Sequence, residues 1–559
     1  MSKIAMRYSI ISACCMLLFL FGCSKNSSED ALPVVDPFTF VSATVNGISD
    51  SSLFFNEVGT SPSIKLFFSD PIDIASVQEN LLFNQSSGEA INYSATYEND
   101  NTAIVLKPAS SLGSFSNYKV VISGSLKSAT KISLNKSITV SLTTGLDSAD
   151  KFQRIPEEDL FNLVQRQTFK YFWDFAHPVS GLARERITSG ETVTLGGSGF
   201  GVMAIVTGIH RGFITREEGL ARMQKIVAFL KNKAQRFHGA YPHWLNGTTG
   251  QVQPFSAKDN GADLVETSFL MQGLLTARQY FSNANSNETV LRDDINAIWN
   301  TVEWSWFRKN NENVLYWHWS PDFQWEMNMP IKGWNEGLIT YVLAASSTTY
   351  PIPKSVYDNG WANNGSIRNG NLYYGVQLPL GPANGGPLFF SHYSFLGINP
   401  NGLKDAYADY EIQTKAHSLI NYKYCVANPK KFYGYSGDCW GLTASDDING
   451  YLAHEPNNDN GVISPTAALS SFPYTPVESM KALNFFYYKL GDKLWKDYGF
   501  IDAFSLYEPW FASSYLAIDQ GPIIIMIENH RSKLLWNLFM SCPEVKTGMK
   551  TLGFSSPNL

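Results

Sequence analysis

The sequence has little charge and no excess of positive charge. Charged residues make up 16% of the 559 residues, and 43 Lys and Arg stand against 49 Asp and Glu, for a formal net charge of −6. A protein that binds nucleic acid through its phosphates needs a basic surface, which this composition does not supply. Hydrophobic residues at 44% favour a folded chain. The composition therefore excludes nucleic acid as a partner. The length of 559 residues predicts two or three folded domains.

Cysteine is scarce and is not spaced for metal binding. The six cysteines are Cys14, Cys15, Cys23, Cys425, Cys439 and Cys542. No Cys-x-x-Cys pair occurs, so a structural zinc site is not expected, and we predict no cofactor. Cys425 and Cys439 leave two alternatives open, a disulfide in an oxidising compartment or buried free thiols.

Beyond the N-terminal region, the sequence lacks an apolar run of the roughly 20 residues that a membrane-spanning helix needs. Residues 1–22 combine a short basic segment with an apolar stretch and end at Cys23. This pattern is typical of a signal peptide, and its end resembles a bacterial lipobox, in which the cysteine is lipidated. Residues 23–36 are polar and predict a tether. We therefore expect a lipid-anchored protein of the bacterial cell envelope, attached to a membrane through Cys23; a plain secretory signal is the alternative.

The segment 37–146 has the sequence pattern of an all-β domain. Short runs rich in β-branched and aromatic residues alternate with clusters of Asn, Asp, Gly and Ser, as at 63–68, 118–122 and 137–142. Such spacing predicts an immunoglobulin-like β-sandwich. It contains no convincing catalytic group, so we interpret it as a spacer or support.

The segment 150–559 changes to helical periodicity. Helical patterns recur near 199–211, 261–282, 289–307, 334–346, 404–426, 477–490 and 521–540. Long loops rich in Gly, Pro and Trp separate them, and long loops in a compact domain are usually functional. Paired helices with such loops are typical of an all-α (α/α)6 barrel, and the absence of a fixed-period repeat argues against a solenoid.

Aromatic residues are abundant, with 14 Trp, 27 Tyr and 36 Phe. A large core uses many of them, but aromatic rings also line sugar-binding clefts, because an apolar ring face covers the C–H face of a pyranose. Hydrolysis of a glycosidic bond then needs two carboxyl groups, one to protonate the leaving oxygen and one to attack or to activate water. Acids beside Trp, Gly and His in the long loops are therefore candidate catalytic groups.

One acidic constellation lies at residues 259–266. Asp259, Asp263 and Glu266 are four and three residues apart, so a helix starting here would carry all three on one face. Asp263 with Glu266 also matches an Asp variant of the helix capping box. Capping and catalysis are compatible. Asp259 and Asp263 are therefore predicted catalytic residues, and Glu266 is predicted to bind substrate.

A second constellation surrounds Glu336 in a Gly-Trp-Asn-Glu-Gly segment. Glycine lets a backbone approach a ligand closely, and apolar neighbours raise the pKa of a carboxyl, as a general acid requires. A helix-start acid that only favours the helix dipole is the alternative. Glu336 is the predicted proton donor, and Trp317, His318 and Trp334 are predicted to bind substrate.

Further segments place acids, histidine or arginine beside aromatic residues. The predicted substrate-binding residues among them are Arg186, His243, Trp440, Asp446, Trp510 and Asp519. Asp446 follows a Gly-rich stretch that is also compatible with a simple turn, and Asp519 is also compatible with helix capping. The rings of Trp317, Trp334, Trp440 and Trp510 are expected to form stacking platforms.

Several motifs occur together in chain order, at residues 181–186 (Gly-Leu-Ala-Arg-Glu-Arg), 263–267 (Asp-Leu-Val-Glu-Thr), 333–337 (Gly-Trp-Asn-Glu-Gly), 441–446 (Gly-Leu-Thr-Ala-Ser-Asp) and 519–522 (Asp-Gln-Gly-Pro). Through them, residues 155–545 resemble the bacterial glycoamylase-like domain and, more narrowly, the β-1,2-glucanases of glycoside hydrolase family 144. The resemblance implies an (α/α)6 barrel, no obligatory metal, and hydrolysis of β-1,2-glucan with inversion. It matches Asp259, Asp263, Glu266 and Glu336 to acids of the cleft, and it leaves the general base and the endo or exo mode open.

We therefore expect Glu336 to protonate the leaving oxygen, and a carboxylate among Asp259, Asp263 and Asp519 to activate water directly or through a substrate hydroxyl. Two other classes stay compatible with the residues. A non-catalytic surface glycan-binding lipoprotein would need the aromatic rings but not the acids. A polysaccharide lyase on a helical toroid would instead use Tyr or His with Arg to abstract a proton.

Overall fold

The structure, a computed structural model, describes residues 36–559 and divides them into two units. One unit takes in the described residues up to Gly113 together with Asn117–Thr144, and the other comprises Ser114–Ser116 and Gly145–Leu559. The expected signal peptide 1–22, Cys23 and nearly all of the tether 23–36 lie outside the described residues and stay predictions. Within 36–559, no helix combines the length and apolarity needed to cross a bilayer.

The first unit is made of strands in two sheets. The larger sheet has the order β2 (Ile48–Ser49), β1 (Phe40–Val45), β4 (Ile64–Phe68), β7 (Ala103–Pro108) and β6 (Tyr93–Glu98), all antiparallel. The smaller sheet has the order β3 (Phe54–Val58), β9 (Ile138–Thr144), β8 (Asn117–Ile122) and β5 (Leu81–Gln85), with β3 parallel to β9. A short helix, α1 (Val77–Asn80), precedes β5.

The alternation of side chains explains why this unit folds as a sandwich. Along β4, Ile64 and Leu66 are fully buried while the residues between them are partly exposed, as expected for a strand with one face in the core. Val120 on β8 and Val140 on β9 belong to the same core as the β4 residues, so the two sheets share one interior. The predicted all-β sandwich is confirmed.

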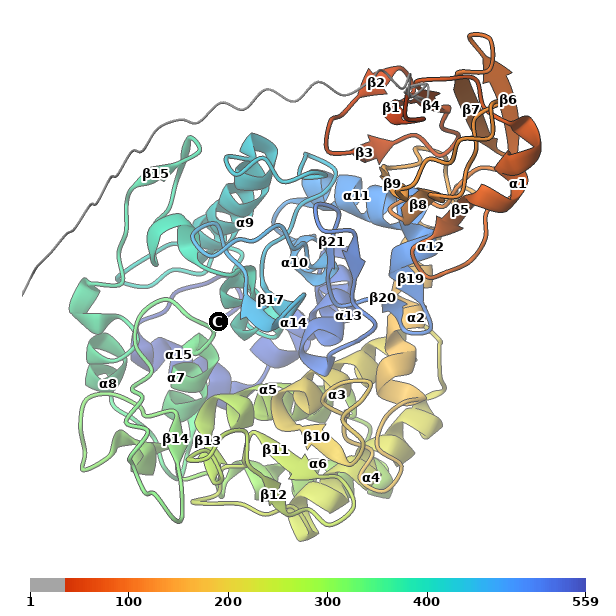
Figure 1. The fold of residues 1–559 in the computed structure, drawn as a ribbon. Coiled ribbons are helices and arrows are strands. Elements are labelled where there is room, and N and C mark those ends of the chain that lie inside the picture. The colour runs from red at the N-terminus through yellow and green to blue at the C-terminus, as the bar shows by residue number, and fades with distance from the viewer. Residues whose placement is uncertain (1–35) are drawn as a thin grey trace, which may run out of the picture. The chain divides into compact units, whose positions relative to one another are not determined.

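The second unit is helical. Its helices are α2 (Glu157–Trp173), α3 (Leu195–His210), α4 (Arg216–Asn232), α5 (Leu264–Tyr280), α6 (Ser286–Trp299), α7 (Leu338–Ser346), α8 (Lys354–Asn359), α9 (Tyr410–Ala427), α10 (Pro465–Leu469), α11 (Pro476–Asn484), α12 (Gly491–Leu494), α13 (Ala517–Arg531), α14 (Leu534–Met540) and α15 (Pro543–Leu552). In Figure 1 they are arranged around a common centre.

Burial separates inner from outer helices. Helices α3, α5, α7 and α13 are buried over almost their whole surface, whereas α2, α4, α6 and α15 bury one face. A helix that is apolar all round belongs in an interior and an amphipathic one covers it. Inner helix α3 packs against α5 and α13, and outer α2 packs against α13. The predicted helical barrel is confirmed.

Short strand pairs join the loops on which the candidate residues lie. They are β10 (Thr192–Thr194), β11 (Trp244–Asn246) and β12 (Val252–Gln253) in one sheet, and the pairs β13 (Ala262–Asp263) with β14 (His318–Trp319), β15 (Leu372–Tyr373) with β16 (Val376–Gln377), β17 (Ala444–Asp447) with β18 (Gly450–Ala453), β19 (Trp495–Lys496) with β20 (Gly499–Phe500), and β21 (Phe504–Ser505) with β22 (Trp510–Phe511). In the register of these pairs, Asp263 lies opposite His318 and Asp446 opposite Tyr451.

The helix expected near residue 261 begins later. Ala262–Asp263 is a strand, and α5 starts at Leu264 with Asp263 as its N-cap. The hypothesis that Asp259, Asp263 and Glu266 share one helix face is therefore wrong, because Asp259 lies in the preceding loop. The thiols of Cys425, Cys439 and Cys542 are free and buried, so the alternative of a Cys425–Cys439 disulfide is not realised.

The contact between α3 and α5 generates a stability prediction. A Cβ at Gly199 would collide with the backbone carbonyl of Phe269, and one at Gly273 with that of Gly199. Because backbone cannot move aside as a side chain can, we expect Gly199→Ala to lower the free energy of unfolding by about 3 kcal/mol, measured by urea denaturation. Gly59→Ala, whose Cβ would meet nothing within 4 Å, is the control. Equal stability of both variants would contradict this helix contact.

Candidate active site

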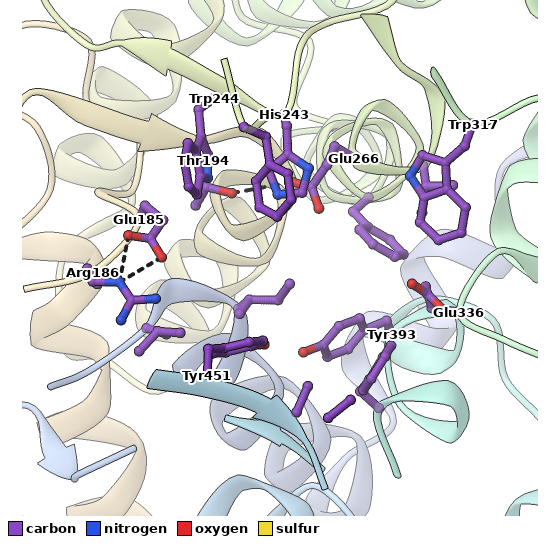
Figure 2. Close-up of a pocket in the computed structure, with 18 residues that line it drawn as sticks. Glu185, Arg186, Thr194, His243, Trp244, Glu266, Trp317, Glu336, Tyr393 and Tyr451 are labelled. Atoms are coloured by element: carbon purple, nitrogen blue, oxygen red, sulfur yellow. Dashed lines mark hydrogen bonds and ion pairs between the residues drawn. The ribbon is translucent and has the colours of Figure 1, made fainter. Parts of the chain in front are cut away.

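A pocket of about 410 Å³, called here the main pocket, lies in the helical unit. Its lining combines aromatic rings with three carboxyl groups from distant parts of the chain, those of Glu185, Glu266 and Glu336. The lining residues are Glu185, Arg186, Thr194, His243, Trp244, Phe255, Val265, Glu266, Phe269, Trp317, Glu336, Phe389, Tyr393, Ala444, Tyr451, Ala453, Leu516 and Ile518. Figure 2 shows Glu336 and Trp317 on one side of it and Glu185 and Arg186 on the other.

Glu336 has the properties of a general acid. It lies in the turn before α7, where Ser394 Oγ donates a hydrogen bond to its backbone carbonyl. Burial, together with the charges of Asp263 and Glu266, raises the pKa of Glu336 to about 7. A carboxyl with this pKa is substantially protonated at neutral pH and can donate a proton.

Glu266 is held by the N-terminal end of α3. Its Oε2 accepts hydrogen bonds from the backbone N–H of Gly196 at 2.7 Å and from Thr194 Oγ1 at 3.3 Å. The approach requires glycine, since a Cβ at residue 196 would lie 2.7 Å from the same oxygen. Burial raises the pKa of Glu266, partly offset by His243 and these hydrogen bonds. Glu266 is thus a fixed carboxyl group on the pocket wall.

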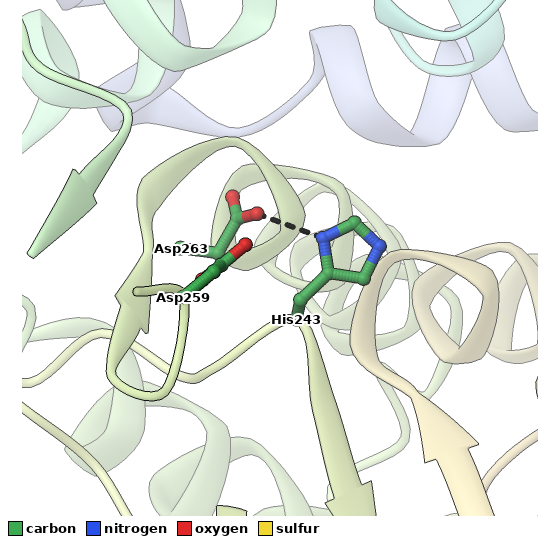
Figure 3. Close-up of side chains that lie close together, drawn as sticks. All are labelled: His243, Asp259 and Asp263. Atoms are coloured by element: carbon green, nitrogen blue, oxygen red, sulfur yellow. Dashed lines mark hydrogen bonds and ion pairs between the residues drawn. The ribbon is translucent and has the colours of Figure 1, made fainter. Parts of the chain in front are cut away.

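Two histidines and two aspartates form a chain of charges beside Glu266. His243 Nδ1 lies 2.9 Å from Asp263 Oδ2 (Figure 3), and His318 Nε2 lies 3.6 Å from that oxygen and 3.5 Å from Asp259 Oδ2. The other oxygen of Asp263 caps α5, accepting hydrogen bonds from the N–H groups of Val265 and Glu266. Asp263 therefore caps the helix and joins the cluster, as the sequence allowed.

Mutual pairing sets the ionisation of this cluster. Burial alone would lower the pKa of His243, but Glu266 and Asp263 raise it to about 9. Burial would raise the pKa of Asp263, but the hydrogen bond from His243 and the nearby imidazole of His318 lower it. Burial and the adjacent Asp263 raise the pKa of Asp259 to about 6. At neutral pH, His243 is an imidazolium and Asp263 a carboxylate.

The same cluster contains the candidate metal ligands among residues 36–559. His243, Asp259 and Asp263 offer ligand atoms that lie within 4.8 Å of one another. A metal-bound histidine must be neutral, whereas the surrounding acids keep His243 protonated. In the structure, His243 and Asp263 are paired as opposite charges.

A second acidic cluster comprises Asp446, Asp502 and Asp519. Asp446 Oδ1 accepts a hydrogen bond from Arg186 Nη1 at 2.9 Å, and its backbone N–H donates to Asp502 Oδ2 at 2.7 Å. Burial and Asp446 raise the pKa of Asp502 to about 7, and burial and Asp502 raise the pKa of Asp519 well above its usual range. Asp519 is therefore protonated and hydrogen-bonds to Asp502.

The structure corrects several predicted substrate contacts. Trp440 is fully buried and Trp334 is 5% exposed, so neither ring is a stacking platform; both are held in the core, where Trp334 packs near Trp361 and Phe395. Asp519 is 2% exposed, lies outside the main pocket and does not cap α13. It is enclosed by the helix on which it lies and by Asp502, so it does not contact substrate or activate water directly.

The other predicted residues lie at or near the pocket. Arg186, His243, Glu266, Trp317 and Glu336 line it. Asp259, Asp263 and His318 lie behind the wall that His243 and Glu266 form. Asp446 and Trp510 line a second cavity instead, which also contacts Arg186.

Sequence reasoning missed Phe255, Tyr393 and Asp502. Phe255 lines the pocket, is 50% exposed and packs its ring against His243 with a centroid distance of 4.2 Å. Nothing in the sequence near Phe255 or Tyr393 distinguishes them from core residues. The sequence could have identified Asp502, because it is a single acid in the apolar segment 500–504. An acid in such a segment is buried only when it has partners.

Comparisons with known proteins agree with this geometry. Residues 328–543 match the family described as "Putative glucoamylase", and residues 52–149 match a bacterial Ig-like domain. The exo β-1,2-glucooligosaccharide sophorohydrolase of Parabacteroides distasonis is 48% identical over 440 residues, 75% of this chain. The present chain covers 60% of the length of that relative.

Two solved structures extend the comparison. The endo-β-1,2-glucanase of Chitinophaga pinensis, in complex with sophorotriose and glucose, is 56% identical with a TM-score of 0.71, over 73% of this chain and 100% of its own. A β-1,2-glucanase of Parabacteroides distasonis is 40% identical with a TM-score of 0.70, over 93% of this chain and 73% of its own.

The helical barrel and its acid-lined pocket therefore have the architecture of the glycoside hydrolases to which the chain is similar. Within that class, the chain belongs to the glycoamylase-like family, in the β-1,2-glucanase branch known as glycoside hydrolase family 144.

The buried Asp502–Asp519 pair predicts a specific pH dependence of stability. The pKa of Asp519 is raised by folding, so its stabilising proton is fully present below the unfolded pKa of about 3.9, and stability falls as pH rises above it, by about 1.4 kcal/mol per pH unit per proton. Asp519→Asn keeps a hydrogen-bond donor without this proton. We expect its free energy of unfolding to fall less steeply from pH 5 to pH 8 than that of the wild type.

Denaturant unfolding at each pH measures the slopes. Asp438→Asn, at an exposed acid, should retain the wild-type slope. If Asp519→Asn also retained it, Asp519 would be ionised in the folded protein, contrary to the assignment above.

Proposed function

We propose that this protein hydrolyses β-1,2-linked glucan. The observation that carries the proposal is the presence of Glu336, with its pKa raised to about 7, and Glu266 in the same aromatic-lined pocket. The support for the linkage is that the relatives described above are named for β-1,2-glucan or its oligosaccharides.

In this proposal, Glu336 protonates the glycosidic oxygen of the leaving sugar. Glu266 accepts a proton from the attacking water, directly or through a substrate hydroxyl, while the water oxygen bonds to the anomeric carbon and the glycosidic bond breaks. The negative charge of the neighbouring Asp263 raises the pKa of Glu266 and so favours this proton uptake. A direct attack by water inverts the anomeric configuration, for which two carboxyl groups about 6.5–9.5 Å apart are typical. The platforms for the sugar rings are the partly exposed ring of Trp317 and the exposed rings of Phe255 and Tyr451, in place of the buried Trp334 and Trp440.

A panel of purified glucans tests the proposal directly. We expect new reducing ends from β-1,2-glucan and at most traces from β-1,3-glucan, β-1,4-glucan and starch. The reason is that the relatives described above are all named for the β-1,2 linkage. Nuclear magnetic resonance of the first products should show the α-anomer, as inversion of a β-linkage requires. Hydrolysis of starch in preference to β-1,2-glucan would overturn the linkage assignment, and an initial β-anomer would overturn inversion.

Removal of the proton donor tests the mechanism. Glu336→Gln keeps the shape of the side chain but donates no proton, so we expect kcat to fall by about 10²- to 10⁴-fold while oligosaccharide binding is retained. For the wild type, the rate should fall as the pH rises above about 7, because Glu336 then loses its proton.

Steady-state kinetics and calorimetric titration with a β-1,2-glucooligosaccharide separate these effects. Glu217→Gln, at an exposed position of α4, is the control and should leave both quantities unchanged. Near-normal turnover by Glu336→Gln would show that another group supplies the proton.

A further inference from the structure

A second cavity meets the main pocket at Arg186. This cavity has a volume of about 320 Å³ and is lined by Arg186, Ile187, Thr188, Asp446, Asp447, Gly450, Trp510, Phe511, Ala512, Ser513 and Ser514. Arg186 lines both spaces. Strand β18 also contributes to both spaces, since Tyr451 lines the main pocket and Gly450 the second cavity. The two cavities are therefore neighbours along one wall.

Arg186 is held rigidly between the two cavities. Its Nε donates hydrogen bonds to both carboxylate oxygens of Glu185, at 3.0 and 2.9 Å, and its Nη1 donates to Asp446 Oδ1 at 2.9 Å. Asp446 is held in turn by the hydroxyl of Ser514. Among the bonds found in residues 36–559, none uses Nη2 of Arg186, so this nitrogen is available to a ligand hydroxyl. An arginine fixed by acids on two sides presents its remaining donors in a defined direction.

The position of Arg186 gives the second cavity a place on the substrate path. Figure 2 shows Glu185 and Arg186 across the main pocket from Glu336. A chain cleaved beside Glu336 and lying along the main pocket would reach Arg186 at its far end. The second cavity begins there, so it would receive sugar units distant from the cleaved bond.

The lining of the second cavity suits a pyranose ring. Trp510 is partly exposed, and the hydroxyl-bearing residues Thr188 and Ser513 are exposed. An aromatic face covers the C–H face of a sugar, while hydroxyl groups pair with its rim. Asp447 adds a carboxylate, already held by the N–H groups of Asn449 and Asn460.

We propose that the second cavity is a distal subsite for the glucan chain, reached across Arg186, with Trp510 as its stacking platform. This inference rests on the proposed hydrolysis of β-1,2-glucan. If the subsite exists, the enzyme should prefer long glucan chains to short ones. Chains that extend from the main pocket past Arg186 gain contacts that short oligosaccharides do not make, so kcat/KM rises with chain length.

The test compares Trp510→Ala with the wild type on a series of linear β-1,2-glucooligosaccharides, from the shortest that the wild type hydrolyses to the polymer. We expect kcat/KM of the variant to be unchanged within about twofold on the shortest substrate and about three- to tenfold lower on the longest, the range expected for loss of one stacked ring. Tyr507→Ala, in the turn that leads into β22 and lining neither cavity, should match the wild type at every length.

A second variant controls for the case in which Trp510→Ala misfolds the β21–β22 region. Ser513→Arg, at an exposed position, fills the cavity without removing a ring and should produce the same loss confined to long chains. Length profiles of both variants parallel to the wild-type profile would overturn the distal subsite, as would equal losses on short and long chains. If the wild type hydrolyses no β-1,2-glucan, it is the proposed function that fails.

Discussion

The cost of burying carboxyl groups governs the organisation of this protein. Asp259, Asp263, Glu266, Asp502 and Asp519 are each at most 4% exposed, and an unpaired carboxylate in such a place would be strongly unfavourable. Different acids are stabilised against this cost by different interactions. His243 and His318 pair with Asp263, the backbone of α3 donates to Glu266, and Asp519 keeps its proton.

Because these interactions differ, the pKa values of the acids differ, and so do the roles that the acids can take. Where partners donate to the carboxylate, as at Asp263, the pKa falls below its usual range, and where burial dominates, as at Glu336, it rises to about 7. A glycosidase needs both kinds, one acid that holds a proton and one that has lost it. In the main pocket, Glu266 lies in the first turn of α5 and Glu336 in the turn before α7.

The packing of the barrel makes this possible. Glycines at the crossing of α3 and α5 let the two helices approach at backbone distance, and this approach brings Gly196 within hydrogen-bonding distance of Glu266. A larger residue in α3 would separate the helices and leave the carboxylate without its donor. The interior contact that stabilises the inner ring of helices is thus also the contact that positions a catalytic-site acid.

The sequence by itself determined the local structure and the chemistry that was available. Short runs of β-branched and aromatic residues between turn-forming clusters identified the strands of the first unit, and helical periodicity identified α3, α5 and α13. The loop motifs around Glu336 and Asp263 identified the family. Only the tertiary structure decided which of these side chains meet. Trp334, Trp440 and Trp317 have the same side chain, yet two are buried and one faces the pocket, because exposure depends on segments far away in the chain. Likewise, the partner of Asp519 is Asp502, and that of Glu266 is a backbone amide seventy residues earlier. The ionisation and exposure of a side chain depend on neighbours that are distant in the sequence, and local sequence patterns do not predict which residues these are.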